Sequence, residues 1–112
     1  MKRGDVFDAQ LNPTEGSEQA GIRPVIIVSR DAINQYSSVI VVVPVTSADN
    51  MKRSYPNNLF IQAGQGGLTA DSVALGGQVR AITKMRLLRQ RGSLAPDMMA
   101  QIDQILRITL DL

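Results

Sequence analysis

The side chains that this chain offers for chemistry are limited by two absences. Its 112 residues include no histidine and no cysteine. A histidine-based catalytic triad, a zinc site of histidine or thiolate ligands, and a thiol nucleophile are therefore excluded. Any catalysis must use arginine, lysine, carboxylates, hydroxyls or the backbone, and no disulfide contributes to the fold.

One arginine stands where its conformation is restricted. Arg23 directly precedes Pro24, and the residue before a proline is held in an extended conformation. We expect Arg23 at a junction between a loop and a strand, with its guanidinium projecting into a cleft. The guanidinium is permanently charged, and its fork of donors matches phosphate oxygens. Thr46, just beyond Pro44, could add a neutral hydroxyl to such a site.

Positive charge is concentrated near the C-terminal end, although the net charge is only +2. No acid lies between Asp71 and Asp97, whereas this stretch contains Arg80, Lys84, Arg86, Arg89 and Arg91. A local field of this kind suits a polyanion. A solvated surface is the alternative for any run of charges, and the run alone slightly favours that alternative.

Strand patterns dominate the chain and predict a mainly β fold. Short strands are expected over residues 5–10, 24–29, 39–43, 59–62, 72–82 and 91–94. Pro44 is expected to end the third of these, and Gly76-Gly77 to interrupt the fifth with a bulge or a sharp bend. Pro96 suits the first turn of a C-terminal helix, whose apolar stripe is Met99, Ile102, Ile105, Leu106 and Thr109. We predict a single domain over 1–112, a small bent β-barrel with a C-terminal α-helix.

The chain contains no feature of a membrane or secreted protein. No apolar run reaches the roughly 20 residues that a membrane helix needs, and no apolar stretch follows the basic N-terminus. We therefore expect a cytoplasmic protein.

Several segments together resemble the signatures of MazF/PemK-type toxins. They lie in the same order and spacing along essentially the whole chain: residues 3–6 (RGDV), 12–19 (NPTEGSEQ), 21–29 (GIRPVIIVS), 43–46 (VPVT) and 71–80 (DSVALGGQVR). Two positions depart from the family pattern. Gly77 replaces an acid that commonly precedes the glutamine, and Ala95 replaces a serine cap, which costs about 1 kcal/mol of helix stability.

The resemblance implies a homodimer of SH3-like barrels that cleaves single-stranded mRNA at short sequences without metal or other cofactor. Members of this family leave a 2′,3′-cyclic phosphate and a 5′-hydroxyl, and a cognate antitoxin protein silences them. Carried over by position, the catalytic arginine is Arg23, the catalytic hydroxyl is Thr46, and a supporting acid is Glu18.

RNA contacts are expected from two polar loops and from the segment after Gly77. The residues concerned are Ser17, Gln19, Lys52, Arg53, Tyr55, Gln78, Arg80 and Arg86. Single-stranded RNA favours aromatic platforms and basic grooves, and Tyr55 beside Lys52 and Arg53 is the best stacking candidate. Phe7 and Phe60 fall in strand patterns and are expected in the core.

Cleavage at a 2′-hydroxyl requires a base, charge neutralisation at phosphorus and a proton for the leaving oxygen. Arg23 suits the neutralisation, Thr46 can orient a phosphate oxygen, and Glu18 is the most plausible base. Each also has an ordinary structural explanation: an ion-paired surface arginine, a satisfied strand hydroxyl and a solvated loop carboxylate.

Two other functions stay open from the sequence. One is a non-catalytic toxin of the same barrel that binds a protein such as DNA gyrase, since fold does not fix function. The other is an inactive family member, in which Gly77 would account for the loss of activity. A metal-dependent nuclease is disfavoured, because the aspartates are scattered without ligand-like spacing.

Overall fold

The computed structural model describes residues 1–112 and is built around the nine-residue strand β3 (Val39–Ser47). The first part of β3 pairs antiparallel with β2 (Ile22–Ile27) and β6 (Arg80–Thr83), and its end pairs with β5 (Ser72–Leu75). The other strands are β1 (Asp5–Gln10), β4 (Asn58–Ile61) and β7 (Leu87–Ser93). The seven-stranded sheet has the order β4-β5-β3-β2-β1-β7, with β6 paired to β3. The predicted mainly β fold is confirmed.

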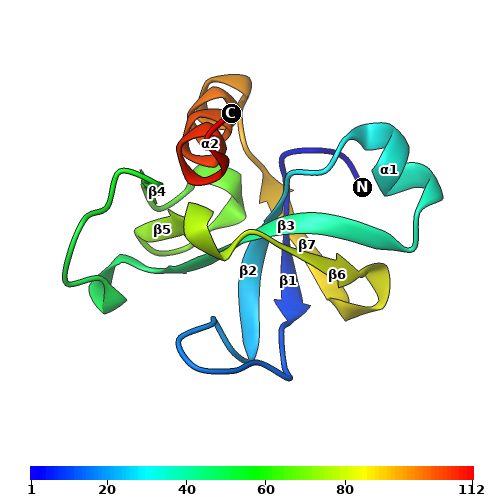
Figure 1. The fold of residues 1–112 in the computed structure, drawn as a ribbon, viewed down its shortest axis with the longest axis horizontal. Helices are drawn as coiled ribbons and strands as arrows, with labels where there is room; N and C mark the ends of the chain where they lie inside the picture. Colours follow the sequence, from blue (N-terminus) through cyan, green and yellow to red (C-terminus); the bar gives the residue numbers. More distant parts are fainter.

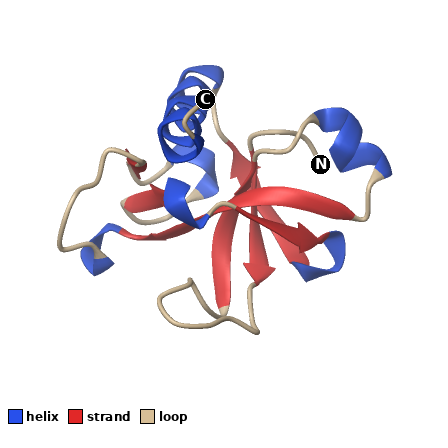
Figure 2. Cartoon of the chain, in the orientation of Figure 1, coloured by secondary structure: helices blue, strands red, loops and turns tan.

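Helices and 3₁₀ turns connect the strands. Helix α1 (Asp31–Tyr36) joins β2 to β3, and α2 (Pro96–Leu110) ends the chain. The 3₁₀ turns are η1 (Ala48–Asn50), η2 (Gln65–Gly67), η3 (Gly76–Gln78) and η4 (Lys84–Arg86). Figure 1 shows the β3–β4 loop and α1 at opposite ends of the long axis, and Figure 2 shows how helical segments surround the bent sheet. Neither α1 nor α2 has the length and apolarity to cross a lipid bilayer.

The sheet is buried on both faces, which explains the continuous apolar runs in β2 and β3. Ile26, Val43 and Val45 belong to a cluster that α2 covers. Val25 and Val42 belong to a second cluster, on the opposite side of the same strands. Because successive strand residues face opposite ways, the part of a strand that lies between two clusters is apolar at successive positions.

Helix α2 closes the first cluster as its sequence pattern predicts. Pro96 lies in its first turn, and Ala95 supplies no side-chain cap. The buried residues of the helix are Met98, Met99, Ile102 and Ile105. An ion pair between Arg3 and Asp103 joins the N-terminal segment to the exposed side of α2.

Two expected strand boundaries differ clearly from the structure. Strand β3 continues through Pro44 to Ser47, because β5 pairs with its other edge from Val45 onward although the ladder with β2 ends at the Val25–Pro44 pair. Strand β7 covers Leu87–Ser93, whereas the sequence predicts it over 91–94. The stretch 72–82 is interrupted at Gly76-Gly77 as expected, and the interruption is the turn η3 between β5 and β6.

Turn η2 packs so closely on β7 that one of its residues has no room for a side chain. Gly67 has φ +74°, and a Cβ at this position would lie 2.0 Å from the carbonyl oxygen of Arg91. Gly64, which precedes the same turn, has φ +96° but no atom within 4 Å of a built Cβ. A comparison of alanine substitutions at Gly67 and Gly64 therefore separates the cost of backbone strain from the cost of a steric clash.

We expect Gly67→Ala to cost about 3 kcal/mol or more of unfolding free energy, because backbone strain and clash add. Gly64→Ala is the matched control and should cost about 1 kcal/mol, from the left-handed backbone alone. Urea unfolding followed by circular dichroism measures both. Equal losses in the two variants would show that the close approach of η2 and β7 contributes nothing.

Candidate active site

The two residues predicted to be catalytic line one pocket, at the point where the ladder between β2 and β3 ends. Val25–Pro44 is the last pair between β2 and β3, and two further steps in that register would place Arg23 opposite Thr46. The strands separate there, and a pocket of about 180 Å³ opens between them. Its wall also includes Ser47, Ser72 and residues 68–70 after η2.

The guanidinium of Arg23 is positioned by the backbone and free at its outer end. Its Nε donates to the carbonyl oxygen of Ala20 at 3.2 Å. Its two terminal nitrogens make no hydrogen bond within the protein, and no carboxylate pairs with it. Arg23 is therefore not an ion-paired surface arginine. Its remaining donors are available to an anion in the pocket.

The hydroxyl of Thr46 is held in a defined orientation by a residue that sequence reasoning missed. Thr46 is only 3% exposed, and its Oγ1 accepts a hydrogen bond of 3.0 Å from Nδ2 of Asn50, which lies in η1. A hydroxyl that accepts in this way keeps its own hydrogen for another acceptor. Thr46 can therefore donate to a phosphate oxygen in the pocket.

A second arginine, Arg91, which the sequence placed only in the basic run, lines the same pocket. Arg91 donates from Nη1 to Asp8 at 3.2 Å and from Nε to the carbonyl oxygen of Gly67 at 3.4 Å. Asp8 also accepts from Arg89 at 3.1 Å, so one carboxylate faces two guanidinium groups. The local charge therefore remains positive.

Glu18, the predicted base, lies outside the pocket of Arg23 and Thr46. It is exposed, and its Oε1 accepts from the backbone N–H of Glu15 at 2.7 Å. It lines an adjoining depression together with Gln19, Pro44, Gln78 and Arg80. This depression shares no lining residue with the active pocket, although Pro44 of the one and Val45 of the other are consecutive in the chain.

Gln78 uses its side-chain amide to hold the β1–β2 loop. Its Oε1 accepts from the backbone N–H of Gln19 at 2.7 Å, and its Nε2 donates to the carbonyl oxygen of Ser17 at 3.3 Å. The three residues were predicted as RNA contacts. The structure gives Gln78 the additional task of fixing the loop that carries the other two.

The basic residues after residue 79 do not form a single open binding site for an anion. Arg80 donates to the carbonyl oxygen of Leu11 at 3.4 Å, and Arg86 donates to that of Gln10 at 2.9 Å and to that of Asn12. Arg89 and Arg91 pair with Asp8, as described above. Most of these side chains therefore bind the β1–β2 loop and β1. Of the two predicted RNA contacts, Arg80 and Arg86, only Arg80 also lines the depression that contains Glu18.

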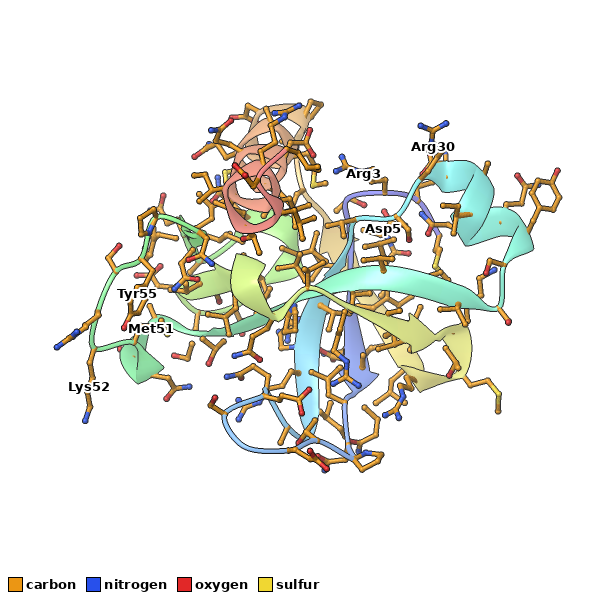
Figure 3. All side chains as sticks on the ribbon, viewed as in Figure 1. Arg3, Asp5, Arg30, Met51, Lys52 and Tyr55 are labelled. Carbon is orange, nitrogen blue, oxygen red and sulfur yellow. The ribbon has the colours of Figure 1, made fainter.

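The predicted contacts of the β3–β4 loop line two further pockets, one of which adjoins the depression of Glu18. Lys52 and Arg53 are exposed and line a pocket of about 270 Å³. Tyr55 lines a neighbouring depression with Gln19 and Gln78. Figure 3 shows Met51, Lys52 and Tyr55 along this loop, with Lys52 extending away from the body of the protein.

Phe60 is not a core residue, which corrects the sequence-based expectation. Strand β4 is the edge of the sheet, and its neighbouring residues Leu59 and Ile61 pack in the core. Phe60 therefore points outward, is 56% exposed, and lines the same pocket as Lys52 and Arg53. Phe7, by contrast, packs partly buried against the second core cluster.

Carboxylates do not gather in this region. No group of three or more aspartate and glutamate side chains has an arrangement that could hold a metal ion.

Gly77 lines the two depressions on either side of Gln78, and a Cβ there would lie 3.0 Å from Nδ2 of Asn57. A side chain at this position would therefore alter the floor of both depressions.

Comparison with known proteins identifies the family. Residues 2–110 match the family described as PemK-like, MazF-like toxin of type II toxin-antitoxin system. The chain belongs to this toxin family. The endoribonuclease EndoA of Bacillus subtilis is 40% identical over 112 residues, which cover 100% of this chain and 96% of that protein.

Solved structures of MazF-like toxins have the same fold. The crystal structure of MazF from Deinococcus radiodurans matches with a TM-score of 0.84 and 25% identity, covering 100% of this chain and 97% of that one. An endoribonuclease from a mycobacterial species, solved in complex with its cognate antitoxin, matches with a TM-score of 0.82 and 24% identity, covering 100% and 96%. The sequence-based family assignment is confirmed.

We expect Gln78→Ala to loosen the β1–β2 loop of this MazF-like toxin, because the N–H of Gln19 loses its acceptor. One hydrogen bond contributes about 0.5–1.5 kcal/mol, so amide exchange at Gln19 should accelerate about 2- to 10-fold. Hydrogen–deuterium exchange with residue-level resolution measures this. Gln104→Ala, at an exposed position of α2, is the control. Unchanged exchange at Gln19 would refute the loop-holding role of Gln78.

Proposed function

We propose that this chain is an endoribonuclease toxin that cleaves single-stranded mRNA at a short sequence, without metal, to a 2′,3′-cyclic phosphate and a 5′-hydroxyl. The observation that carries the proposal is the pocket shared by Arg23, with its free guanidinium, and Thr46, with its oriented hydroxyl. Membership in the toxin family and the 40% identity to an endoribonuclease support it. They disfavour the alternative of a non-catalytic toxin that binds gyrase.

The reaction assigns one task to each group. The 2′-oxygen attacks phosphorus and loses its proton to a base, and the bond from phosphorus to the 5′-oxygen breaks. Arg23 neutralises the charge on the non-bridging oxygens of the phosphorane, where a fixed fork of charged donors is most effective. Thr46 donates its hydroxyl hydrogen to one of these oxygens and fixes the orientation of the phosphate.

Glu18 is proposed to accept the 2′-hydroxyl proton from the adjoining depression. It belongs to the β1–β2 loop, which is held by two hydrogen bonds of Gln78. The same loop contains Gly16 at φ +58°, and a Cβ at Gly16 would have no other atom within 4 Å. RNA that spans the active pocket and the adjoining depression would bring its 2′-hydroxyl towards this carboxylate. The proton for the leaving 5′-oxygen then comes from solvent or from the protonated base.

The partners follow from the family and from the charge of the pocket. We propose that residues 1–112 act as one toxin domain, in the cytoplasm and as a homodimer. A cognate antitoxin would silence it by placing an acidic segment over Arg23, because such a segment matches the positive field that attracts RNA.

We expect Arg23→Ala to lower the cleavage rate about 100- to 1000-fold, because a preorganised donor to the phosphorane is lost. The assay incubates purified protein with a long defined transcript in excess EDTA and maps both ends of every fragment. Cyclic phosphate and 5′-hydroxyl ends are expected at one recurring sequence.

Arg23→Lys separates charge from geometry, since it keeps the charge and loses the fork; its rate should also fall well below that of the wild type. Thermal unfolding of each variant checks the fold. Intact RNA with the wild-type protein across many sequences would refute the proposed function. Full activity of Arg23→Ala would remove this residue from the mechanism.

We expect Glu18→Gln to lower the single-turnover rate about 100-fold, because general-base catalysis typically contributes at least that much. Glutamine retains an oxygen that can accept from the N–H of Glu15, so the loop contact is preserved while the basic group is removed. Glu15→Gln in the same loop is the matched control and should leave the rate unchanged. A wild-type rate in Glu18→Gln would assign the base elsewhere.

A further inference from the structure

The sheet register aligns the proposed catalytic hydroxyl with an exposed aromatic ring. Thr46 on β3 is paired with Val73 on β5, and Val73 is paired with Phe60 on β4. Side chains of directly paired residues project from the same face of an antiparallel sheet. Thr46, Val73 and Phe60 therefore form one row across three strands. With strands about 4.8 Å apart, the backbone of Phe60 lies about 10 Å from that of Thr46.

The surroundings of Phe60 combine an apolar floor with positive charge. The ring is 56% exposed, although it is a large apolar group at the edge of the sheet. Met51 and Val73 line the pocket next to it, and Lys52 and Arg53 supply two cations. None of the residues that line this pocket is acidic.

The two pockets are lined by neighbouring residues of the chain. Ser47 lines the active pocket, and the next residue, Ala48, lines the pocket of Phe60. The same holds for Ser72 and Val73 on β5. Because Thr46 and Phe60 belong to one row on the same face, a ligand bound at Arg23 and Thr46 that extends along this row towards β4 approaches Phe60.

We propose that Phe60 is the stacking platform for a nucleobase near the scissile phosphate, and that Lys52 and Arg53 bind the phosphates on that side. The proposal rests on the RNA cleavage proposed above. An aromatic face flanked by cations and free of acids matches the two components of a single-stranded nucleotide, a flat base and an anionic phosphate. A protein partner would bury a wider apolar surface than a single ring bordered by charged residues provides.

The test measures RNA affinity separately from chemistry. Single-turnover cleavage of a labelled oligoribonucleotide that contains the mapped target sequence is followed over a range of protein concentrations. Phe60→Ala should raise the half-saturating concentration about tenfold, the typical effect of removing one stacking aromatic. The rate at saturation should change little, because Phe60 does not contact the reacting atoms.

Two further variants show whether the aromatic face is the cause. Phe60→Trp should retain or improve affinity, whereas Phe60→Leu, which stays apolar but loses the ring, should resemble Phe60→Ala. Tyr36→Ala is the control, since Tyr36 is an aromatic residue that is 82% exposed on α1, at the far end of the molecule (Figure 1).

A set of substrates, each with one abasic nucleotide near the cleavage site, locates the stacked base. With wild-type protein, one abasic position should weaken binding about tenfold, and at that position Phe60→Ala should cause no further loss. Wild-type affinity in Phe60→Ala, equal loss in Tyr36→Ala, or fully additive losses at every abasic position would each overturn the proposal.

The remaining outcomes distinguish failure of the stacking role of Phe60 from failure of the endoribonuclease function. If Phe60→Ala alters the sedimentation of the protein and leaves its RNA affinity unchanged, the ring is a contact between protein chains and the proposal is overturned. If the wild-type protein cleaves RNA and only the stacking tests fail, the proposed endoribonuclease function still stands. If the wild-type protein cleaves no RNA, the function itself fails.

Discussion

The site depends on the end of one of the two ladders that β3 forms. The ladder between β2 and β3 ends at the Val25–Pro44 pair, whereas β3 continues to Ser47 and is paired on its other edge with β5. Beyond Pro44, β3 is therefore no longer paired with β2, and Arg23 and Thr46 line the pocket that lies there. Arg23 is still paired with Ala9 on β1, and Thr46 is paired with Val73 on β5, so the sheet fixes the backbone positions of both residues.

The arginines divide into structural and available groups according to what they contact. Arg80 and Arg86 donate to carbonyl oxygens near the β1–β2 loop, and Arg91 pairs with a carboxylate. Arg23 keeps two terminal nitrogens without protein acceptors, and Lys52 lies exposed beside Arg53. The positive charge that can meet an anion therefore lies around the active pocket and the β3–β4 loop. Net charge, only +2, conceals this distribution.

Much of the fold and part of the site could be predicted from the sequence. Apolar periodicity placed the strands and α2, and the proline after Arg23 indicated an extended residue at a loop–strand junction. Two features could not be predicted. Taken alone, Pro44 suggests a strand end. The continuation of β3 beyond it depends on pairing with β5, which lies far along the chain. Phe60 suggests a core residue, because its exposure follows from β4 being at the sheet edge. Both depend on long-range pairing that a local pattern does not contain.

Turn η3 lies at the meeting point of three parts of the chain. Gly76 donates its N–H to the carbonyl oxygen of Asn57 at 3.0 Å, and a Cβ there would lie 3.0 Å from Oγ1 of Thr109 on α2. Two residues later, Gln78 binds the backbone of Ser17 and Gln19. Turn η3 is therefore in contact with the terminal helix, the β3–β4 loop and the β1–β2 loop at once. Because thermodynamic linkage is reciprocal, a ligand that ordered the loops through this turn would also strengthen the attachment of α2, and fraying of α2 would weaken binding of that ligand.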